Sequence, residues 1–90
     1  MGSVNIRLFG LSGMASRMNK FSQPIQGATS VELLWAEIQN SAEPGELIAT
    51  IDRDALLVLV NGRPIHLLDG WQTRAQDGDE ITFMLKTAGG

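Results

Sequence analysis

The chain has 90 residues, of which 43% are hydrophobic and 19% charged, with a net charge of −3 and no cysteine. This length predicts one domain with a modest core, and the lack of cysteine excludes disulfides, thiolate metal sites and a cysteine nucleophile. The few Lys and Arg residues are scattered, so nucleic-acid binding, which requires clustered positive charge, is not expected. The longest apolar run, residues 55–60, is far shorter than the ~18 residues of a membrane span, so we expect a cytoplasmic protein without membrane contact.

Alternating apolar and polar residues open the chain. Val4, Ile6 and Leu8 recur at every second position, which predicts a strand with one face toward the core. A weaker strand is predicted over residues 20–26. Pro24 lacks an amide donor there and indicates an edge strand or a bulged one.

A helix is the clearest local prediction. Thr29 and Glu32 have the spacing of a capping box, in which each side chain bonds a backbone amide at the helix start. Pro44 and Gly45 predict its end. Positions at helical spacing form one apolar face, made of Val31, Leu34, Trp35, Ile38 and Ala42.

Further strands are predicted in the second half of the chain. Residues 55–60 are apolar on both faces and predict a buried strand. Asn61-Gly62 is a strong hairpin signal because both residues tolerate positive φ, so residues 63–67 should form the returning strand. Two Asp-Gly turns then lead to a last strand over residues 80–85.

The order strand, strand, helix, strand, strand, strand predicts an α+β fold with one main helix packed on one face of a mixed sheet. The ubiquitin-like β-grasp fits this order, with the first and last strands side by side at the centre of the sheet. We expect a single β-grasp domain over residues 1–90, with a flexible C-terminal tail over residues 86–90.

The interior of the chain carries no catalytic pattern. His66 is the single histidine, so no histidine dyad or metal cluster can be built around it, and we expect a strand histidine of mixed exposure. The pairs Asp52/Asp54 and Asp77/Asp79 lack the remaining ligands of a calcium loop and are better explained as turn residues. We expect no metal, no cofactor and no enzymatic activity of the chain's own.

The sequence ends in Gly89-Gly90. A frayed terminus is one interpretation. The other is chemical, because a C-terminal carboxylate can be activated as an acyl-adenylate that sulfur or nitrogen then attacks. Residues without Cβ can thread a narrow channel of another protein, so a flexible tail can reach ATP without unfolding the domain.

The chain resembles the MoaD/ThiS family of ubiquitin-like sulfur carriers. The matching segments cover nearly the whole chain in the family's order: "VNIRLFG", "GATSVELLWAEI", "VLVNGRPI", "DGWQTRAQDGDEITF" and the closing "AGG". The resemblance implies that Gly90 bears the carboxylate that a ubiquitin-activating-type enzyme adenylates with ATP and that is then converted to a thiocarboxylate. Ala88 and Gly89 would be the threaded approach.

The family contains several pathways, and the resemblance favours the MoaD type because of the long segment after the helix. The implied partner is then the large subunit of molybdopterin synthase. A carrier for the thiamine thiazole or for another sulfur-accepting synthase is the alternative. A ubiquitin-like modifier joined to lysines through Gly90 is another, and a β-grasp binding module with an idle tail is a third.

The last strand also predicts a docking surface. If Ile81, Phe83 and Leu85 face the helix, Met84 points to the uncovered face of the sheet, together with Thr82 and Lys86. Phe9, beside that strand in a β-grasp, would join Met84, and Trp71 would border the two. Exposed Met and Phe in one patch commonly mark binding surfaces. The alternative is that Phe9 and Trp71 fold back into a satellite core.

Overall fold

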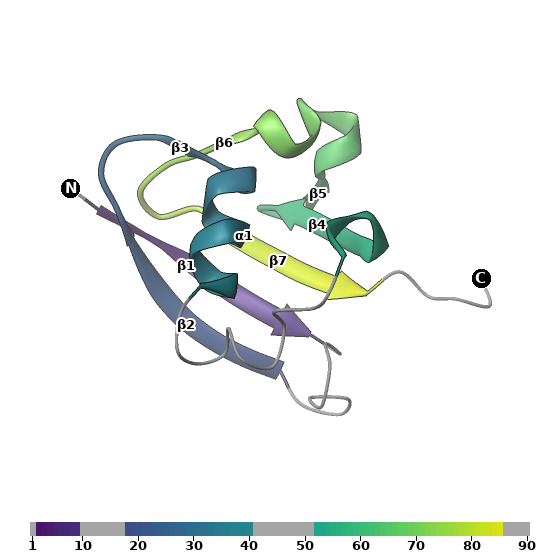
Figure 1. The fold of residues 1–90 in the computed structure, drawn as a ribbon. Helices are drawn as coiled ribbons and strands as arrows, with labels where there is room; N and C mark the ends of the chain where they lie inside the picture. The colour runs from purple at the N-terminus through teal and green to yellow at the C-terminus, as the bar shows by residue number, and fades with distance from the viewer. Residues whose placement is uncertain (1, 10–17, 41–51, 86–90) are drawn as a thin grey trace.

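A computed structural model of the chain describes residues 2–9, 18–40 and 52–85 (Figure 1). Short 3-10 helices connect parts of its second half: η1 (Arg53–Ala55), η2 (Ile65–Leu67) and η3 (Gly70–Gln72). The strands and the helix are, in chain order, β1 (Gly2–Phe9), β2 (Met18–Ile25), β3 (Thr29–Ser30), α1 (Val31–Gln39), β4 (Leu56–Val60), β5 (Arg63–Pro64), β6 (Arg74–Ala75) and β7 (Glu80–Leu85).

One mixed sheet organises the molecule, with the strand order β2-β1-β7-β4-β5. The central strands β1 and β7 run parallel, and the other neighbours run antiparallel. The short strands β3 and β6 pair separately. The predicted central pairing of the first and last strands is confirmed, as is the edge position of the strand that contains Pro24. This is the α+β ubiquitin-like β-grasp fold that the element order predicts.

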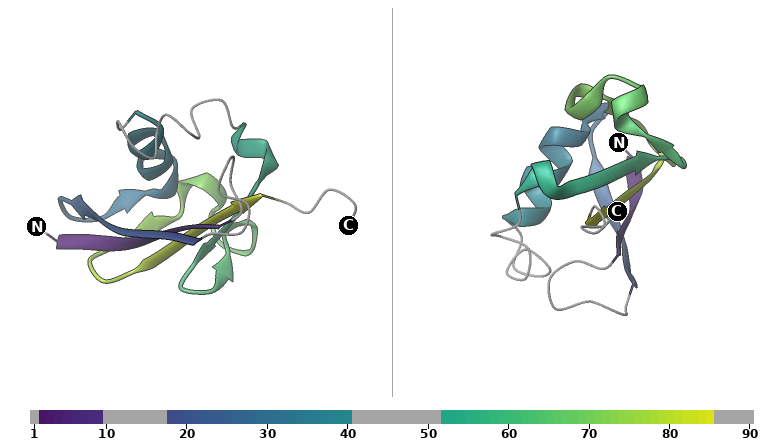
Figure 2. Two further views of the ribbon diagram at one scale, coloured as in Figure 1. Left: turned by 90° about the horizontal axis from the view of Figure 1, so that it is seen from below. Right: turned by 90° about the vertical axis from the view of Figure 1, so that its right-hand side faces the viewer.

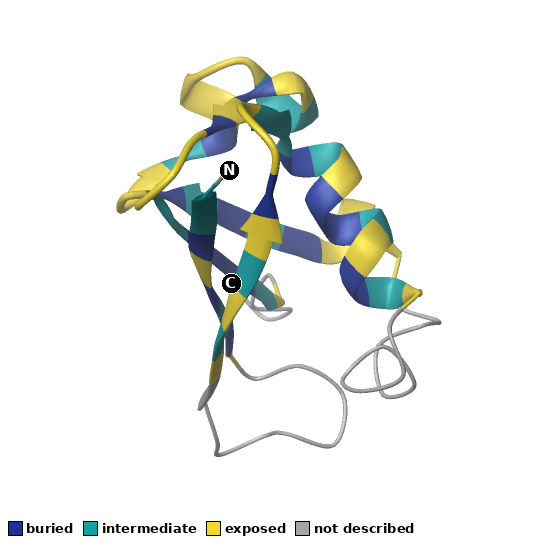
Figure 3. Ribbon diagram, turned by 90° about the vertical axis from the view of Figure 1, so that its left-hand side faces the viewer, coloured by how far each residue is buried: buried dark blue, intermediate teal, exposed yellow. Residues whose placement is uncertain are grey.

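The helix α1 covers one face of this sheet, as Figure 2 shows. The buried residues of the helix and the strands face each other in Figure 3. Trp35 of α1 and Phe83 of β7 meet at the centre, with ring centroids 4.9 Å apart. The largest fully buried side chains are Phe83, Ile6, Leu8, Leu34, Ile38 and Ile81. The alternation of β1 and β7 therefore faces the helix, as predicted.

The predicted capping box at the helix start is wrong by one residue. The N-cap is Ser30, whose Oγ accepts a hydrogen bond from the backbone N–H of Leu33 at 3.2 Å. Thr29 instead pairs with Ala75 between β3 and β6, which fixes it in the strand before the helix. Glu32 is also diverted, because its carboxylate bonds side chains of other segments.

The other end of the helix agrees only in part with the prediction. The helix ends at Gln39, and Asn40 is its C-cap. Four of the predicted face residues, Val31, Leu34, Trp35 and Ile38, are buried. Ala42, Pro44 and Gly45 lie outside the described residues.

The hairpin after β4 forms at Asn61-Gly62, where φ is 53° and 84°, which confirms this turn. The returning strand is shorter than predicted. It ends at Pro64, and the chain turns into η2 because Ile65 is buried in the core instead of continuing along the sheet edge. His66 is therefore an exposed residue of a 3-10 helix and not a strand residue.

The aspartates bond backbone amides, as predicted from turn chemistry. Asp52 accepts from the N–H of Asp54 at 3.0 Å, and Asp79 accepts from that of Gln76 at 2.9 Å. The carboxylate of Asp77 reaches further and accepts from the N–H of Ser3 in β1 at 2.9 Å. Within the described ranges, no group of three metal-ligating side chains occurs, and no helix is long and apolar enough to cross a membrane.

Candidate functional site

The three residues expected to carry the chemistry, Ala88, Gly89 and Gly90, lie outside the described residues. The description ends at Leu85, the last residue of the central strand β7. Figure 1 shows this end of β7 at the opposite end of the sheet from the start of β1. The surface beside the end of β7 is therefore the described part of the candidate site.

Pairing between strands brings apolar side chains together at this end of the sheet. Phe9, the last residue of β1, pairs with Met84 of β7, and Met84 pairs on its other side with Leu57 of β4. Directly opposite residues of neighbouring strands point to the same face. Because Ile81 and Phe83 face α1, these three side chains lie on the face that the helix leaves uncovered.

We call the resulting surface the open-face patch. Phe9 is its most exposed member at 46%, and the others are half-buried. Its members are Phe9, Leu57, Leu59, Pro64 and Met84, since Leu59 pairs with Pro64 on the same face. An apolar surface of this kind beside the start of a C-terminal segment is suited to docking another protein.

Phe9 and Met84 therefore lie together on the uncovered face, as expected. Thr82 also lies on this face, as expected, and is 9% exposed. One neighbouring expectation needs correction. Leu85 lies on the same side of β7 as Phe83 but is 39% exposed. The part of β7 that belongs to the core therefore ends at Phe83 and not, as predicted, at Leu85.

Charged residues border the patch. Arg7 of β1 donates to Glu80 of β7 at 3.3 Å, and Lys20 of β2 pairs opposite Arg7. Both ion-pair side chains are partly exposed, so this pair contributes little to stability. The apolar centre with a charged border has the layout of a protein-binding surface.

Trp71 packs as a satellite of the core, although it also lines one hollow with Leu57 of the patch. Its ring packs against the core and lies under the guanidinium of Arg53, 5.2 Å from the ring centroid. Arg53 in turn bonds Glu32 of α1, which puts this cluster on the helix side of the sheet. The satellite-core interpretation therefore holds for Trp71 and not for Phe9.

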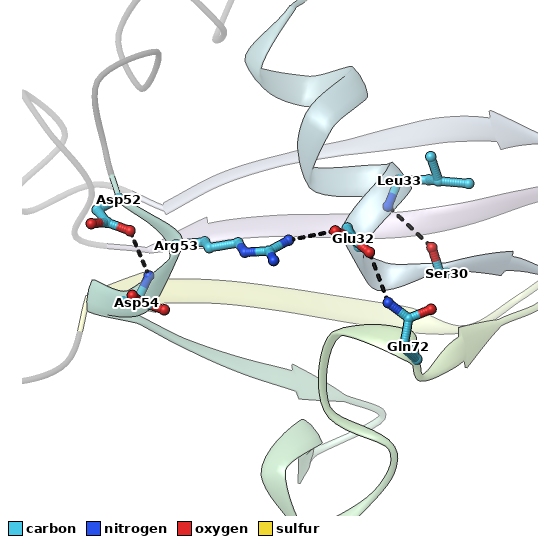
Figure 4. Close-up of polar contacts among 7 residues, drawn as sticks. All are labelled: Ser30, Glu32, Leu33, Asp52, Arg53, Asp54 and Gln72. Atoms are coloured by element: carbon cyan, nitrogen blue, oxygen red, sulfur yellow. Dashed lines mark hydrogen bonds and ion pairs between the residues drawn. The ribbon is translucent and has the colours of Figure 1, made fainter.

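Glu32 joins three segments at the start of the helix (Figure 4). Its two carboxylate oxygens accept hydrogen bonds from Arg53 and from Gln72, each at 2.8 Å. These bonds, first that from Arg53, lower the pKa of Glu32 below its usual value of 4.5. The contact links η1 and η3 to the start of the helix at the protein surface.

Sequence reasoning missed Leu57, Leu59 and Pro64 as members of the patch. Residues 55–60 were expected to be buried on both faces, whereas Leu57 and Leu59 are only half-buried. A signal was present in the sequence. Residues 55–60 are apolar on both faces, and one helix can cover only one face of the sheet. One row of apolar side chains in this strand must therefore lie on the uncovered face.

The described residues bring Phe9, Leu57 and Met84 together in one apolar patch on the uncovered face. The chain matches no protein-family model and no curated protein. Solved structures share its fold. Small archaeal modifier protein 1 from Methanosarcina acetivorans has a TM-score of 0.66 at 21% identity, over 100% of this chain and 98% of that chain.

The protein of the same name from Haloferax volcanii has a TM-score of 0.60 at 23% identity, over 99% of this chain and 100% of that chain. A further Haloferax volcanii protein has a TM-score of 0.59 at 22% identity, over 99% and 89%. At this identity the likeness establishes the ubiquitin-like β-grasp fold.

Proposed function

We propose that the protein is a ubiquitin-like carrier that acts through the carboxylate of Gly90. The observation that carries the proposal is the open-face patch beside the end of β7, directly before the segment that ends in Gly89-Gly90. An activating enzyme that docks on Phe9 and Met84 has the tail within reach of its ATP site. The chain supplies the acyl group and the docking surface, and the partner supplies the catalysis.

The chemistry proceeds in two balanced steps. The Gly90 carboxylate attacks the α-phosphorus of ATP and releases pyrophosphate, which gives an acyl-adenylate. A hydrosulfide-equivalent donor then attacks the carbonyl carbon and AMP leaves, which gives a thiocarboxylate. The Ala88-Gly89 approach has small side chains or none, which suits a narrow channel.

Sulfur transfer in cofactor biosynthesis is the use we favour, with the large subunit of molybdopterin synthase as acceptor. The long segment between α1 and β4 supports the MoaD type. A thiamine-thiazole synthase or another sulfur-accepting synthase is the alternative acceptor. In either case we place the reaction in the cytoplasm, where ATP for the adenylation step is available.

A modifier function is the second candidate, and the comparisons favour it. Two of the proteins that share the fold are small archaeal modifiers. In this case the amine of a lysine attacks the same adenylate, or an ester derived from it, and forms an isopeptide bond with Gly90. Both candidates require the same carboxylate and the same activating enzyme.

The decisive experiment measures the mass of the product. The protein is incubated with an adenylating enzyme of the ubiquitin-activating type, ATP and a sulfur donor. We expect a gain equal to the mass difference between sulfur and oxygen, and no gain for a chain that lacks Gly90. Sulfur incorporation that persists without Gly90 would place the chemistry elsewhere.

The two candidates are separated in cells. A tagged protein isolated under denaturing and reducing conditions shows covalent ladders on other proteins if it is a modifier, and none if it is a carrier alone. Cells whose protein lacks Gly89 and Gly90 and that grow as wild type would instead support a binding module with an idle tail.

A further inference from the structure

A groove lies at the end of the sheet where β1 begins, away from the last residue of β7. It has a volume of about 780 Å³ and runs between the last residues of β2 and the exposed side of α1. A smaller hollow of about 210 Å³ shares Gly2, Ile25 and Ala28 with it. Because β1 and β7 are parallel, this groove at the start of β1 is at the opposite end from the last residue of β7.

An exposed leucine lines the groove. Leu33 of α1 is 58% exposed although its neighbour Leu34 is fully buried. Pro24 and Ile25 of β2 provide apolar surface across from it. Leu33 therefore adds exposed apolar surface to the groove without contributing to the core.

The outer edge of β2, from which Pro24 lines the groove, offers further backbone groups beyond it. Ser3 donates its N–H to Asp77 and accepts from the N–H of Gly78, and Asn5 donates to the carbonyl of Asp79. The odd residues of β1 therefore direct their backbone groups toward β7, away from β2. In an antiparallel pair, when one residue directs its N–H and C=O away from the partner strand, the residue opposite it does the same. The β2 partners opposite the odd residues of β1 therefore direct their backbone groups away from β1, toward the free edge of β2.

Those partners are Lys20, Ser22 and Pro24. Lys20 and Ser22 each present a donor and an acceptor at the free edge, and Pro24 presents an acceptor only. Pro24 is tolerated because the N–H it lacks would have pointed outward. Among the described strands, none pairs with this edge.

The charge of the groove limits what can occupy it. Glu37 lines the main groove and Asp77 the adjoining hollow, and among the described residues no Lys or Arg lines either. Glu37 accepts one hydrogen bond, from Gln23 at 3.3 Å, and is exposed. Positive charge on a ligand is therefore complementary beside Glu37, whereas Lys20, four residues before Pro24 on the β2 edge, disfavours it at the other end.

We propose that this groove binds an extended segment of a partner protein, which adds a strand to the outer edge of β2. The segment places aliphatic side chains against Leu33 and Ile25 and a Lys or Arg beside Glu37. Backbone hydrogen bonds supply affinity, and the alternate side chains supply specificity. The groove lies at the start of β1 and the open-face patch beside the end of β7, with Lys20 of the β2 edge at the border of the patch.

The test is a selection from a random-peptide phage library on the immobilised full-length protein. We expect enrichment of peptides that combine aliphatic residues with Lys or Arg. Titration of the labelled protein with the strongest peptide should shift the amides of Lys20 and Ser22 and those around Leu33. No enrichment, enrichment of acidic peptides, or shifts on the open-face patch would overturn the proposal.

Two variants examine the two halves of the site. Leu33→Asp should weaken the selected peptide by about tenfold or more, whereas Leu67→Asp, at a leucine that is 71% exposed elsewhere, should not change it. Ser22→Pro removes only an outward N–H and should keep the fold while it abolishes binding. Unchanged affinity in Leu33→Asp, or in a folded Ser22→Pro protein, would exclude the groove.

Two controls separate peptide binding at the groove from the function of the tail and from self-association. A chain that lacks Gly90 should bind the peptide as the wild type does, so failure of the carrier function leaves this result unaffected. Sedimentation of the free protein should show a monomer. A dimer that persists in the presence of the selected peptide, but that the Ser22→Pro substitution dissociates, would refute the proposed occupant. The β2 edge would then bind a second copy of the chain.

Discussion

Phe83 and Met84 are consecutive residues of β7, yet they lie in different environments. Phe83 is fully buried against Trp35 on the helix side, and Met84 is half-buried beside Phe9 on the open face. One strand therefore places one set of side chains in the core and the other set on the proposed docking surface. The helix decides which set has which role, because it covers one face only.

The same division applies to β4. Val58 is buried opposite Phe83, and Leu57 is half-buried opposite Met84. Both side chains are aliphatic, so their composition alone does not separate core from surface. What separates them is whether the opposing layer is α1 or solvent.

The largest expected effect is a loss of stability when Phe83, the buried residue of the pair Phe83 and Met84, is replaced. Phe83→Ala deletes a fully buried ring and its contact with Trp35. Loss of a buried phenylalanine costs about 3–5 kcal/mol, which is a large part of the stability of a small domain. Urea unfolding followed by circular dichroism measures it. A loss below about 1 kcal/mol would mean that α1 does not pack on this side of the sheet.

The second prediction concerns the open-face member. Met84→Asp places a charge where the side chain is half-exposed, so the free energy of unfolding should fall by no more than about 1 kcal/mol. Adenylation should be strongly reduced, because the charge lies in the proposed docking surface. Pyrophosphate release with the activating enzyme measures this loss, and Leu67→Asp is the control at an exposed leucine away from the patch.

Either of two results would contradict this assignment. Unfolding of the Met84→Asp protein would mean that the faces of β7 are reversed. Adenylation at the wild-type rate by a folded Met84→Asp protein would remove the open-face patch from the docking surface and leave the tail as the only contact.

The smallest effect concerns the polar contact that holds the helix side in place. The folded state lowers the pKa of Glu32 below 4.5, chiefly through the hydrogen bond from Arg53. A lowered pKa means that the contact stabilises the protein above the unfolded pKa and that this stabilisation is lost as the pH falls through the folded pKa. Glu32→Gln should therefore destabilise the protein near neutral pH and become similar to the wild type in acid.

Thermal unfolding of both proteins between neutral pH and acid pH measures the difference. Arg53→Ala removes the larger cause of the shift and leaves the hydrogen bond from Gln72, so it should lose most but not all of the pH dependence. The opposite outcome is a difference in stability between the wild-type and the Glu32→Gln protein that is the same at every pH. That result would show that the ionised carboxylate of Glu32 does not stabilise the protein through this contact.

The sequence alone predicted much of the fold. The alternation in β1 and β7, the apolar face of α1, the edge position of Pro24 and the turn at Asn61-Gly62 are all found as expected. These features depend on periodicity or on the backbone preference of one or two residues, which are local properties. The element order then restricts the topology to very few arrangements.

Tertiary structure decided the remaining features, because each depends on residues distant in the chain. Pairing of Thr29 with Ala75 moves the helix cap to Ser30, and the contact between Arg53 and Glu32 places Trp71 on the helix side. Periodicity also could not distinguish Leu57 from Val58, since both are aliphatic and only the position of α1 buries one of them. Local preference specified the elements of this protein, and the packing of non-local neighbours determined which of their surfaces remain available to a partner.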